Sequence, residues 1–249
     1  MFIKLIACMQ IVRWLLMNYN TLANYYDDLV KDDEATQAWV TWIQKFQKPC
    51  TMLELACGSG EITHELHRLS YQMSALDLSE AMIEKARKKD DKITYYCQDM
   101  RNLSNLGSYD AIACLCDSFN YLLSKEDVLN FFKEVSQHLN QDGLFFFDTH
   151  SLDRLSEFSQ EWNETGTFFD GLHYQWSISS EDDWIYQDFA FYLANGKVEQ
   201  EHHLQRVYTP QWLEEAFAPY FKMIDCCTDF ELAGIQEGEK YFYVLKKEG

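Results

Sequence analysis

The sequence is poor in positive charge, with 21 lysine and arginine residues against 40 aspartate and glutamate residues and a formal net charge of −19. A surface with this charge repels a phosphate backbone. The one compact basic cluster, within residues 85–89, falls on an expected helix face and is explained as a solvated surface. Nucleic acid is therefore not expected as a partner or substrate.

The eight cysteines lack the paired C-x-x-C spacing that is typical of zinc sites. Several stand in apolar, strand-like runs, where cysteine acts as a small hydrophobe. Metal ligation by Cys114 and Cys116 is the alternative, but alternate residues of an apolar strand are far more commonly core residues, so no metal is expected. Cysteines used in this way favour a reducing cytoplasm as the location.

Long hydrophobic runs are also missing, because no stretch reaches the roughly 20 apolar residues that span a membrane. Residues 1–17 are the most apolar segment, but Arg13 interrupts it and Cys8 follows Lys4 by only four positions. A secretory signal needs an apolar region of ~7–15 residues. We expect an N-terminal extension that is either an amphipathic helix or an upstream start before Met17.

Short apolar runs alternate with helical periodicity from Thr51 onward. Strands are expected at residues 51–56, 73–76, 93–97, 111–116 and 144–147, with helices at 61–69, 79–89 and 128–139. Two closing strands, near Met223 and at 241–245, bring the expected number to seven. This order predicts an α/β fold with a doubly wound, mostly parallel seven-stranded sheet.

Residues 151–208 differ from this pattern. The part from 168 to 208 is rich in aromatic residues and alternates with period two, and Asn195-Gly196 is a strong hairpin turn. A helix resumes with Thr209 as its cap and Pro210 at its first position. We therefore expect a small antiparallel lid at 151–208, inserted into an α/β domain made of 18–150 and 209–249.

The segment Glu54-Leu-Ala-Cys-Gly-Ser-Gly60 follows a strand directly and opens a helix. Its glycines allow a sharp turn and a close approach of a ligand to the backbone. Asp77 ends the next strand, where a carboxylate can accept both hydroxyls of a ribose. Thr63 stands where a dinucleotide-binding turn needs a third glycine or alanine, which disfavours a nicotinamide-dependent oxidoreductase. A tight turn without any ligand is the remaining alternative.

Several motifs, in order, resemble those of bacterial class I S-adenosylmethionine-dependent methyltransferases: Leu53–Gly60, Ala75–Met82, Cys97–Met100 and Tyr109–Ile112. Two further segments, Cys116–Leu122 and Phe147–Ser151, resemble a subgroup of small bacterial methyltransferases with an inserted β lid. The resemblance implies an enzyme that transfers a methyl group from S-adenosylmethionine. Because a lid restricts access and the surface is acidic, we expect a small-molecule acceptor. A non-catalytic S-adenosylmethionine-binding protein is the main alternative.

The resemblance also implies a set of cofactor-binding residues: Tyr19, Tyr26, Glu54, Gly58, Gly60, Asp77, Leu78, Met82, Asp99, Met100 and Cys116. The methionine end of the cofactor would be surrounded by Tyr19, Tyr26, Glu54, Gly58 and Gly60. Asp77 would bind the ribose. Leu78, Met82, Asp99 and Met100 would surround the adenine. Cys116 would face the sulfur. A helix-core role for Met82, a turn cap for Asp99 and a core stripe for the tyrosines are the alternatives.

Catalysis does not require a base, because the methyl group on a sulfonium is already activated and alignment supplies ~7–11 kcal/mol. If a base exists, Asp117 at the end of the fourth strand and His150 just past the fifth are the positional candidates. The alternatives are that Asp117 caps the following helix and that His150 is an ordinary loop histidine. The insertion offers aromatic residues as acceptor walls or as the core of a small sheet: Phe168, Phe169, Tyr174, Trp176, Trp184, Tyr186 and Tyr192.

Overall fold

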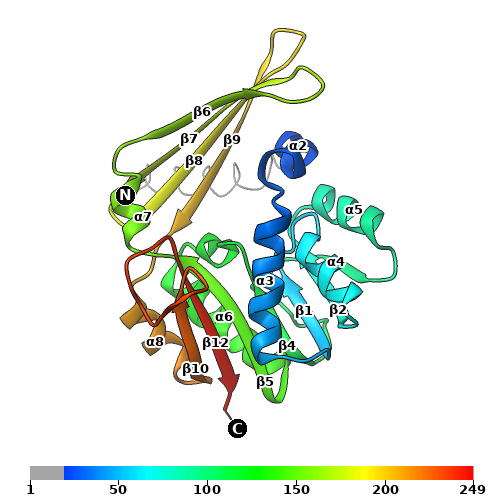
Figure 1. Ribbon diagram of the computed structural model, residues 1–249, viewed down its shortest axis with the longest axis vertical. Helices are drawn as coiled ribbons and strands as arrows, with labels where there is room; N and C mark the ends of the chain where they lie inside the picture. Colours follow the sequence, from blue (N-terminus) through cyan, green and yellow to red (C-terminus); the bar gives the residue numbers. More distant parts are fainter. Residues whose placement is uncertain (1–19, 249) are drawn as a thin grey trace, which may run out of the picture.

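The computed structural model describes residues 20–248, in which an α/β core carries a second, smaller sheet at one end (Figure 1). The expected N-terminal extension and Tyr19, an expected cofactor contact, lie outside the described residues. Within the described part, no helix is both long and apolar enough to cross a membrane.

The core sheet has eight strands in the order β11-β10-β12-β5-β4-β1-β2-β3. Five of them run parallel to one another: β1 (Thr51–Leu55), β2 (Gln72–Asp77), β3 (Thr94–Cys97), β4 (Tyr109–Cys114) and β5 (Leu139–His150). Three antiparallel strands complete the sheet: β12 (Lys240–Lys247), β10 (Phe221–Thr228) and β11 (Leu232–Ala233). The prediction of a doubly wound, mostly parallel sheet is confirmed, and the strand beyond the expected seven is the two-residue β11.

Helices cover both faces of this sheet, so the core has three layers. One layer contains α3 (Asp33–Phe46), α4 (Glu61–Arg68) and α5 (Glu80–Lys89), whose buried side chains share a hydrophobic cluster. The other contains α6 (Lys125–His138) and α8 (Pro210–Phe217), which pack with a phenylalanine-rich cluster. Thr209 accepts a hydrogen bond from the backbone of Trp212, which confirms the expected start of α8.

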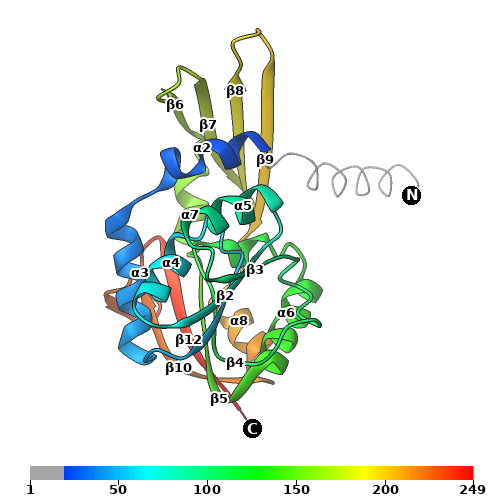
Figure 2. The ribbon, with the colours of Figure 1, turned by 90° about the vertical axis from the view of Figure 1, so that its right-hand side faces the viewer.

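The smaller sheet, here called the lid sheet, has the order β6-β7-β8-β9 and is antiparallel throughout. Its strands are β6 (Trp162–Thr167), β7 (His173–Glu181), β8 (Trp184–Tyr192) and β9 (Val198–Arg206), and the short α7 (Asp153–Glu157) precedes them. The hairpin falls at the expected Asn195-Gly196, but residues 193–197 connect β8 to β9 and Gly196 has positive φ (+80°) while Asn195 does not, so this is a longer loop than a two-residue turn. The lid sheet stands above the carboxyl ends of the parallel strands, with α2 (Asn20–Val30) beside it (Figures 1 and 2).

Strand register decides which lid side chains face the core. Trp176 of β7, Phe189 of β8 and Glu201 of β9 are direct cross-strand partners and therefore share one face. We call this the inner face; its members are Trp162, Glu164, Gly166, Tyr174, Trp176, Ile178, Ser180, Ile185, Gln187, Phe189, Phe191, Glu199, Glu201, His203 and Gln205. Trp184, Tyr186 and Tyr192 lie on the opposite face, and Phe169 is 86% exposed. Only part of the aromatic set thus points toward the core.

Candidate functional site

The turn between β1 and α4 uses left-handed backbone at both of its glycines. Gly58 has φ +53°, and a Cβ placed there would meet only the ring of Tyr26, at 3.9 Å. Gly60 has φ +80°, and its Cβ would lie 3.0 Å from the Cβ of Ala86 and 3.3 Å from the hydroxyl of Tyr95. Gly58 therefore keeps open space beside Tyr26, whereas Gly60 is required by the packing of α5 against the turn.

Asp77, at the end of β2, is held in place by two backbone amides. Its Oδ2 accepts a hydrogen bond from the N–H of Gly58 and its Oδ1 from that of Ser79, both at 2.8 Å. Burial raises the pKa of this carboxyl, and the two amides oppose the increase. Each oxygen retains a lone pair. The carboxylate is thus positioned beside the glycine turn and can accept further hydroxyl donors, as a ribose requires.

Glu54 lies deeper under the same turn and is 3% exposed. The hydroxyl of Thr63 donates a hydrogen bond to its Oε2. Burial raises the pKa of Glu54 to about 7, and repulsion from Asp77 acts in the same direction. A nearby cation stabilises the ionised form of such a carboxyl. The residues therefore fit a positively charged ligand such as S-adenosylmethionine, and Thr63, which breaks the dinucleotide pattern, instead holds Glu54.

Helix α2 lies across the glycine turn and brings Tyr26 to it. The hydroxyl of Ser59 donates to Asp27 at 2.5 Å, and Lys89 pairs with Asp27 at 2.9 Å. Lys85 donates to the carbonyl of Asn24 at 2.9 Å. These contacts attach α2 to both the turn and α5, so the structure brings Tyr26 and Gly58 together, as expected.

The remaining expected cofactor residues have different environments. Leu78 follows Asp77 and is 53% exposed, whereas Met82 is buried in α5. Met100 packs partly against the core, and Cys116 is exposed with φ +56° just beyond β4. Leu78 and Cys116 are thus accessible to a ligand, while Met82 has the environment of a helix-core residue. Their cofactor roles stay predictions.

Asp99 is held by its neighbour Arg101. The guanidinium donates to both carboxylate oxygens at 2.6 to 3.0 Å, and the Arg101 backbone N–H donates to Oδ1 at 2.9 Å. Hydrogen bonds from Arg101 lower the pKa of Asp99 against the effect of burial. The turn-capping alternative is therefore present in the structure, and an adenine contact would have to share this carboxylate.

Asp117 and His150, the positional candidates for a base, lie together in a buried cluster with Lys240. The Asp117 Oδ2 is 3.6 Å from His150 Nε2, and Lys240 forms an ion pair with Oδ1. Asp148, which is fully buried, accepts a hydrogen bond from the Asp117 N–H at 2.8 Å and lies 3.5 Å from Lys240. Lys240 is thus within ion-pair distance of both Asp117 and Asp148.

The lid sheet reaches this cluster through Gln205. Its amide nitrogen donates to Asp117 Oδ2 at 2.8 Å, while its oxygen accepts from Gln187 at 2.8 Å and lies 3.1 Å from His150 Nε2. Only this orientation of the Gln205 amide places an N–H donor, and not the amide oxygen, beside the Asp117 carboxylate. A directed chain of hydrogen bonds therefore runs from β8 through β9 to the end of β4.

Electrostatics argue against Asp117 as a base. Lys240 and His150 outweigh the burial of Asp117 and lower its pKa to about 2, so it is a weak proton acceptor. Burial lowers the pKa of His150, which leaves a neutral imidazole whose Nδ1 has no hydrogen-bond partner among the described residues. Burial also raises the pKa of Asp148 to about 7. The catalytic roles of Asp117 and His150 stay predictions.

Sequence analysis missed Lys240, Asp148 and Gln205. Asp148 stands inside the Phe147–Ser151 motif, so that motif carried a signal for it. Lys240 only precedes an apolar strand, and Gln205 is one polar residue in an alternating strand. Both roles arise from contacts between distant segments and have no local signature.

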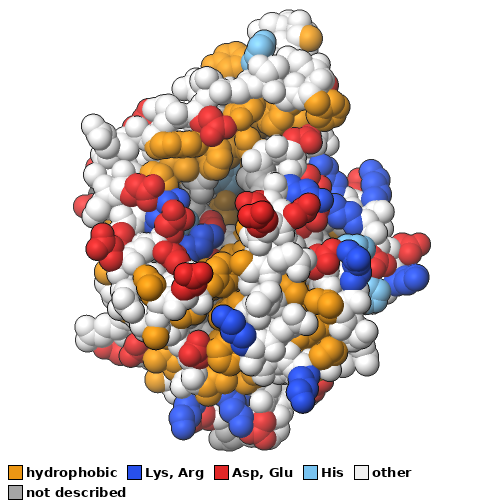
Figure 3. Space-filling view, in the orientation of Figure 1, with side chains coloured by type: hydrophobic (Ala, Val, Ile, Leu, Met, Phe, Trp, Pro, Cys, Tyr) orange, Lys and Arg blue, Asp and Glu red, His pale blue; other side chains and the backbone are white. Residues whose placement is uncertain are grey.

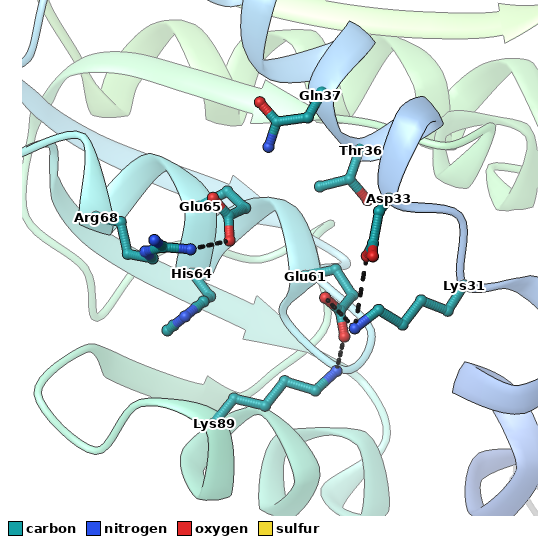
Figure 4. Close-up of a pocket in the computed structure, with 9 residues that line it drawn as sticks. All are labelled: Lys31, Asp33, Thr36, Gln37, Glu61, His64, Glu65, Arg68 and Lys89. Carbon is teal, nitrogen blue, oxygen red and sulfur yellow. Dashed lines mark hydrogen bonds and ion pairs between the residues drawn. The ribbon is translucent and has the colours of Figure 1, made fainter.

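A separate surface groove of about 570 Å³ lies between α3 and α4 (Figure 4). Its cations are neutralised by adjacent carboxylates: Lys31 lies 3.6 Å from both Asp33 and Glu61, and Arg68 lies 3.0 Å from Glu65. Lys89 also pairs with Glu61 in this groove. The groove is therefore not an evident anion site and lies apart from the Asp117 cluster.

Comparison with known proteins agrees with this geometry. Residues 52–143 match the family described as a methyltransferase domain. A protein named putative methyltransferase YqeM, from Bacillus subtilis, is 33% identical over 212 residues, which cover 80% of this chain and 84% of the relative.

Solved structures show the same similarity. An S-adenosylmethionine-dependent methyltransferase from Clostridium acetobutylicum superposes with a TM-score of 0.79 at 28% identity and covers 93% of this chain and 99% of its own. The sugar N-methyltransferase KedS8 from Streptoalloteichus shares the fold, with a TM-score of 0.74 at 17% identity over 92% of this chain and 94% of its own. With its glycine turn, Asp77 and buried Glu54, the chain belongs to the class I S-adenosylmethionine-dependent methyltransferases.

Proposed function

We propose that this methyltransferase acts on a small amine, which binds between the inner face of the lid sheet and the carboxyl ends of β4 and β5. The observation that carries this proposal is the charge of the inner face. It contains Glu164, Glu199 and Glu201 but no lysine or arginine from the four lid strands. A surface of one sign raises the local concentration of ligands of the opposite sign.

Aromatic rings on the same face support a cationic acceptor. Trp176 stacks on Phe189 with 5.1 Å between ring centroids, and Phe189 is stacked with Phe191 at 6.2 Å. Ring faces attract ammonium groups, by about 0.5 to 2 kcal/mol. Figure 3 shows hydrophobic side chains along the lid above a hollow whose edge carries both acidic and basic side chains. This combination suits an ammonium group on a small molecule.

The likeness to KedS8 supports a small acceptor, because that sugar N-methyltransferase shares the fold over nearly its whole length. At 17% identity this likeness carries the architecture alone. A cytoplasmic location is part of the proposal and is supported by the cysteines of residues 20–248, which are all free.

Each part of the site has a distinct task in this proposal. Glu54, Gly58 and Asp77 would hold the cofactor, which supplies an activated methyl group on a cationic sulfur. Tyr26 would cover the methionine end and exclude water. The lid would align the acceptor with the methyl group, and alignment of this kind contributes ~7–11 kcal/mol. The Asp117–Lys240 cluster, with Gln205, would fix the lid above the strand ends.

Calorimetric titration with S-adenosylhomocysteine tests the cofactor residues, with NAD as the negative control. Asp77→Ala should weaken binding more than tenfold, because hydrogen bonds to a charged acceptor contribute about 1.5–3 kcal/mol each. Asp91→Asn is the matched control, since Asp91 is an exposed carboxylate beyond the end of α5 and is not an expected cofactor residue. Equal losses in the two variants would show that Asp77 has no special role.

An acceptor screen tests the amine. Each small amine is paired with the alcohol of the same carbon skeleton, and formation of S-adenosylhomocysteine is measured for both. Turnover of amines and not of their alcohols is the expected result. Turnover confined to alcohols, to proteins or to RNA would overturn the proposed acceptor class.

A further inference from the structure

We propose that Tyr121, His203 and Glu201 form a proton relay that removes a proton from the acceptor nitrogen before methyl transfer. This inference rests on the amine acceptor proposed above. The hydroxyl of Tyr121 is 3.1 Å from Nδ1 of His203, and Nε2 of His203 is 3.8 Å from Oε2 of Glu201. The three groups lie in the order phenol, imidazole and carboxylate.

The fold brings this relay together from two distant segments. Tyr121 ends the short helix η1 (Ser118–Tyr121), which directly follows the end of β4, where the ligands of an open α/β sheet bind. His203 and Glu201 are two residues apart on β9 and therefore share the inner face. The core thus supplies the tyrosine of the relay, and the lid supplies the histidine and the carboxylate.

Burial and contacts define the relay's geometry. His203 and Glu201 are 8% and 4% exposed, while Tyr121 is half-buried and remains reachable. The edge of the His203 ring packs on Phe189, with 5.6 Å between ring centroids. The backbone N–H of Leu22 donates to Oε1 of Glu201 at 2.8 Å, which orients the carboxylate.

The chemistry requires such a path, because a protonated amine has no lone pair with which to attack the methyl group. Tyr121 would take one proton from the ammonium while its own hydroxyl proton moves to Nδ1 of His203. The resulting imidazolium lies beside the carboxylate of Glu201, which stabilises it. The neutral amine then forms its bond to the methyl carbon as the carbon–sulfur bond breaks, and the proton on His203 leaves to solvent.

The other buried histidine is less suited to this task. His150 Nε2 lies against Gln205, and the neighbouring Asp117 is committed to Lys240. Those groups hold the lid, whereas the Tyr121 hydroxyl is partly accessible and lies beside His203. We therefore assign proton removal to Tyr121, acceptance of the tyrosine proton to His203, and stabilisation of the imidazolium to Glu201.

Nitrogen-15 NMR of histidine-labelled protein tests the relay without an acceptor, with His203→Gln used to assign the signal. Neutral His203 is expected to carry its proton on Nε2 and to accept from Tyr121 on Nδ1. Tyr121→Phe should then shift the Nδ1 resonance, and Glu201→Gln the Nε2 resonance. A neutral His203 with its proton on Nδ1 would overturn the relay, because the tyrosine proton could not move to it.

Kinetics with an amine identified in the screen give the second test. Tyr121→Phe and His203→Gln should lower kcat by about 10²-fold or more, with KM and S-adenosylhomocysteine affinity within about twofold. His202→Gln is the matched control, since His202 lies on the outer face of β9 and pairs with Asp188. Unchanged kcat in Tyr121→Phe would overturn the relay. Failure of the wild type to methylate any amine would instead overturn the acceptor class, and the NMR result would still decide the relay.

Discussion

The side-chain amide of Gln205 donates a hydrogen bond to the carboxylate of Asp117 at 2.8 Å, across 88 positions of the sequence. This bond joins the last lid strand to the end of β4. Gln205 is fully buried, and its oxygen also accepts from Gln187. This amide is therefore one of the attachments of the lid to the core, and both its nitrogen and its oxygen take part in hydrogen bonds.

Replacing Gln205 by leucine should destabilise the protein by about 1.5–3 kcal/mol, because the Asp117 carboxylate loses one of its donors and Gln187 loses its acceptor. Urea unfolding measures the change. Gln200→Leu is the control, since Gln200 is exposed on the outer face of the same strand. Similar losses in both variants would contradict a special role for the Gln205–Asp117 bond.

Lys240 lies beside two carboxylates, so its replacement should lower the free energy of unfolding by more than the loss of a single hydrogen bond would. We expect Lys240→Met to lower the free energy of unfolding by about 3–5 kcal/mol, because Asp117 and Asp148 are left buried without a cation. Adding Asp117→Asn should restore part of this loss, because Asp117 has the lower pKa of the two and is the carboxylate left ionised without its cation. A double variant no more stable than Lys240→Met would argue against the charge explanation.

The pKa of Glu54 predicts a pH-dependent stability. The folded protein keeps this carboxyl protonated up to about pH 7, whereas an ordinary glutamate loses its proton near 4.5. Between these values the folded state binds more protons, so the contribution of Glu54 is complete below about pH 4.5 and is lost as pH rises through about 7. Glu54→Gln should therefore gain stability relative to the wild type between pH 5 and 8.

The gain should approach about 3 kcal/mol above pH 7, since the pKa rises from 4.5 to about 7 and one pKa unit corresponds to about 1.4 kcal/mol. Thermal unfolding of the ligand-free proteins at several pH values measures it. The other buried carboxyls, including Asp148, are present in both proteins and cancel in the difference. A difference in stability that does not vary with pH would mean that Glu54 is ionised in the folded protein throughout this range.

The two glycines of the turn should respond differently to alanine. Both substitutions place a side chain at positive φ, which costs roughly 1–2 kcal/mol. Gly60→Ala also forces its Cβ against Ala86 and should cause the larger loss of stability in denaturant unfolding. Gly58→Ala projects toward Tyr26 and should cause the larger loss of S-adenosylhomocysteine affinity. Identical effects on stability and affinity would contradict the distinction.

The cofactor side of the site was accessible to prediction because its determinants are local. Gly58 and Asp77 stand at the ends of consecutive strands that pair in parallel, so their proximity follows from the strand order alone. The hydrogen bond between them has the partners that this order implies. The position of Thr63 beside Glu54 was not predicted, because it depends on side-chain packing under the turn.

The acceptor side depended on contacts that the sequence does not encode locally. Lys240 meets Asp117 across 123 positions, and either residue alone is an unremarkable charged side chain. Period-two alternation predicted the lid strands but could not tell which face meets the core. Trp184 and Tyr186 consequently look equivalent to Trp176 in sequence, although they lie on the opposite face.

Three polar side chains of β9 that contact other segments of the protein occupy every second position of the strand: Glu201, His203 and Gln205. Deletion of a single residue within that strand would invert the orientation of every side chain on one side of the deletion. Relatives that retain this site should therefore vary in β9 only by pairs of residues. A homologue whose β9 differs in length by an even number of residues should keep these three side chains on the inner face. A homologue whose β9 differs by an odd number should lose this arrangement.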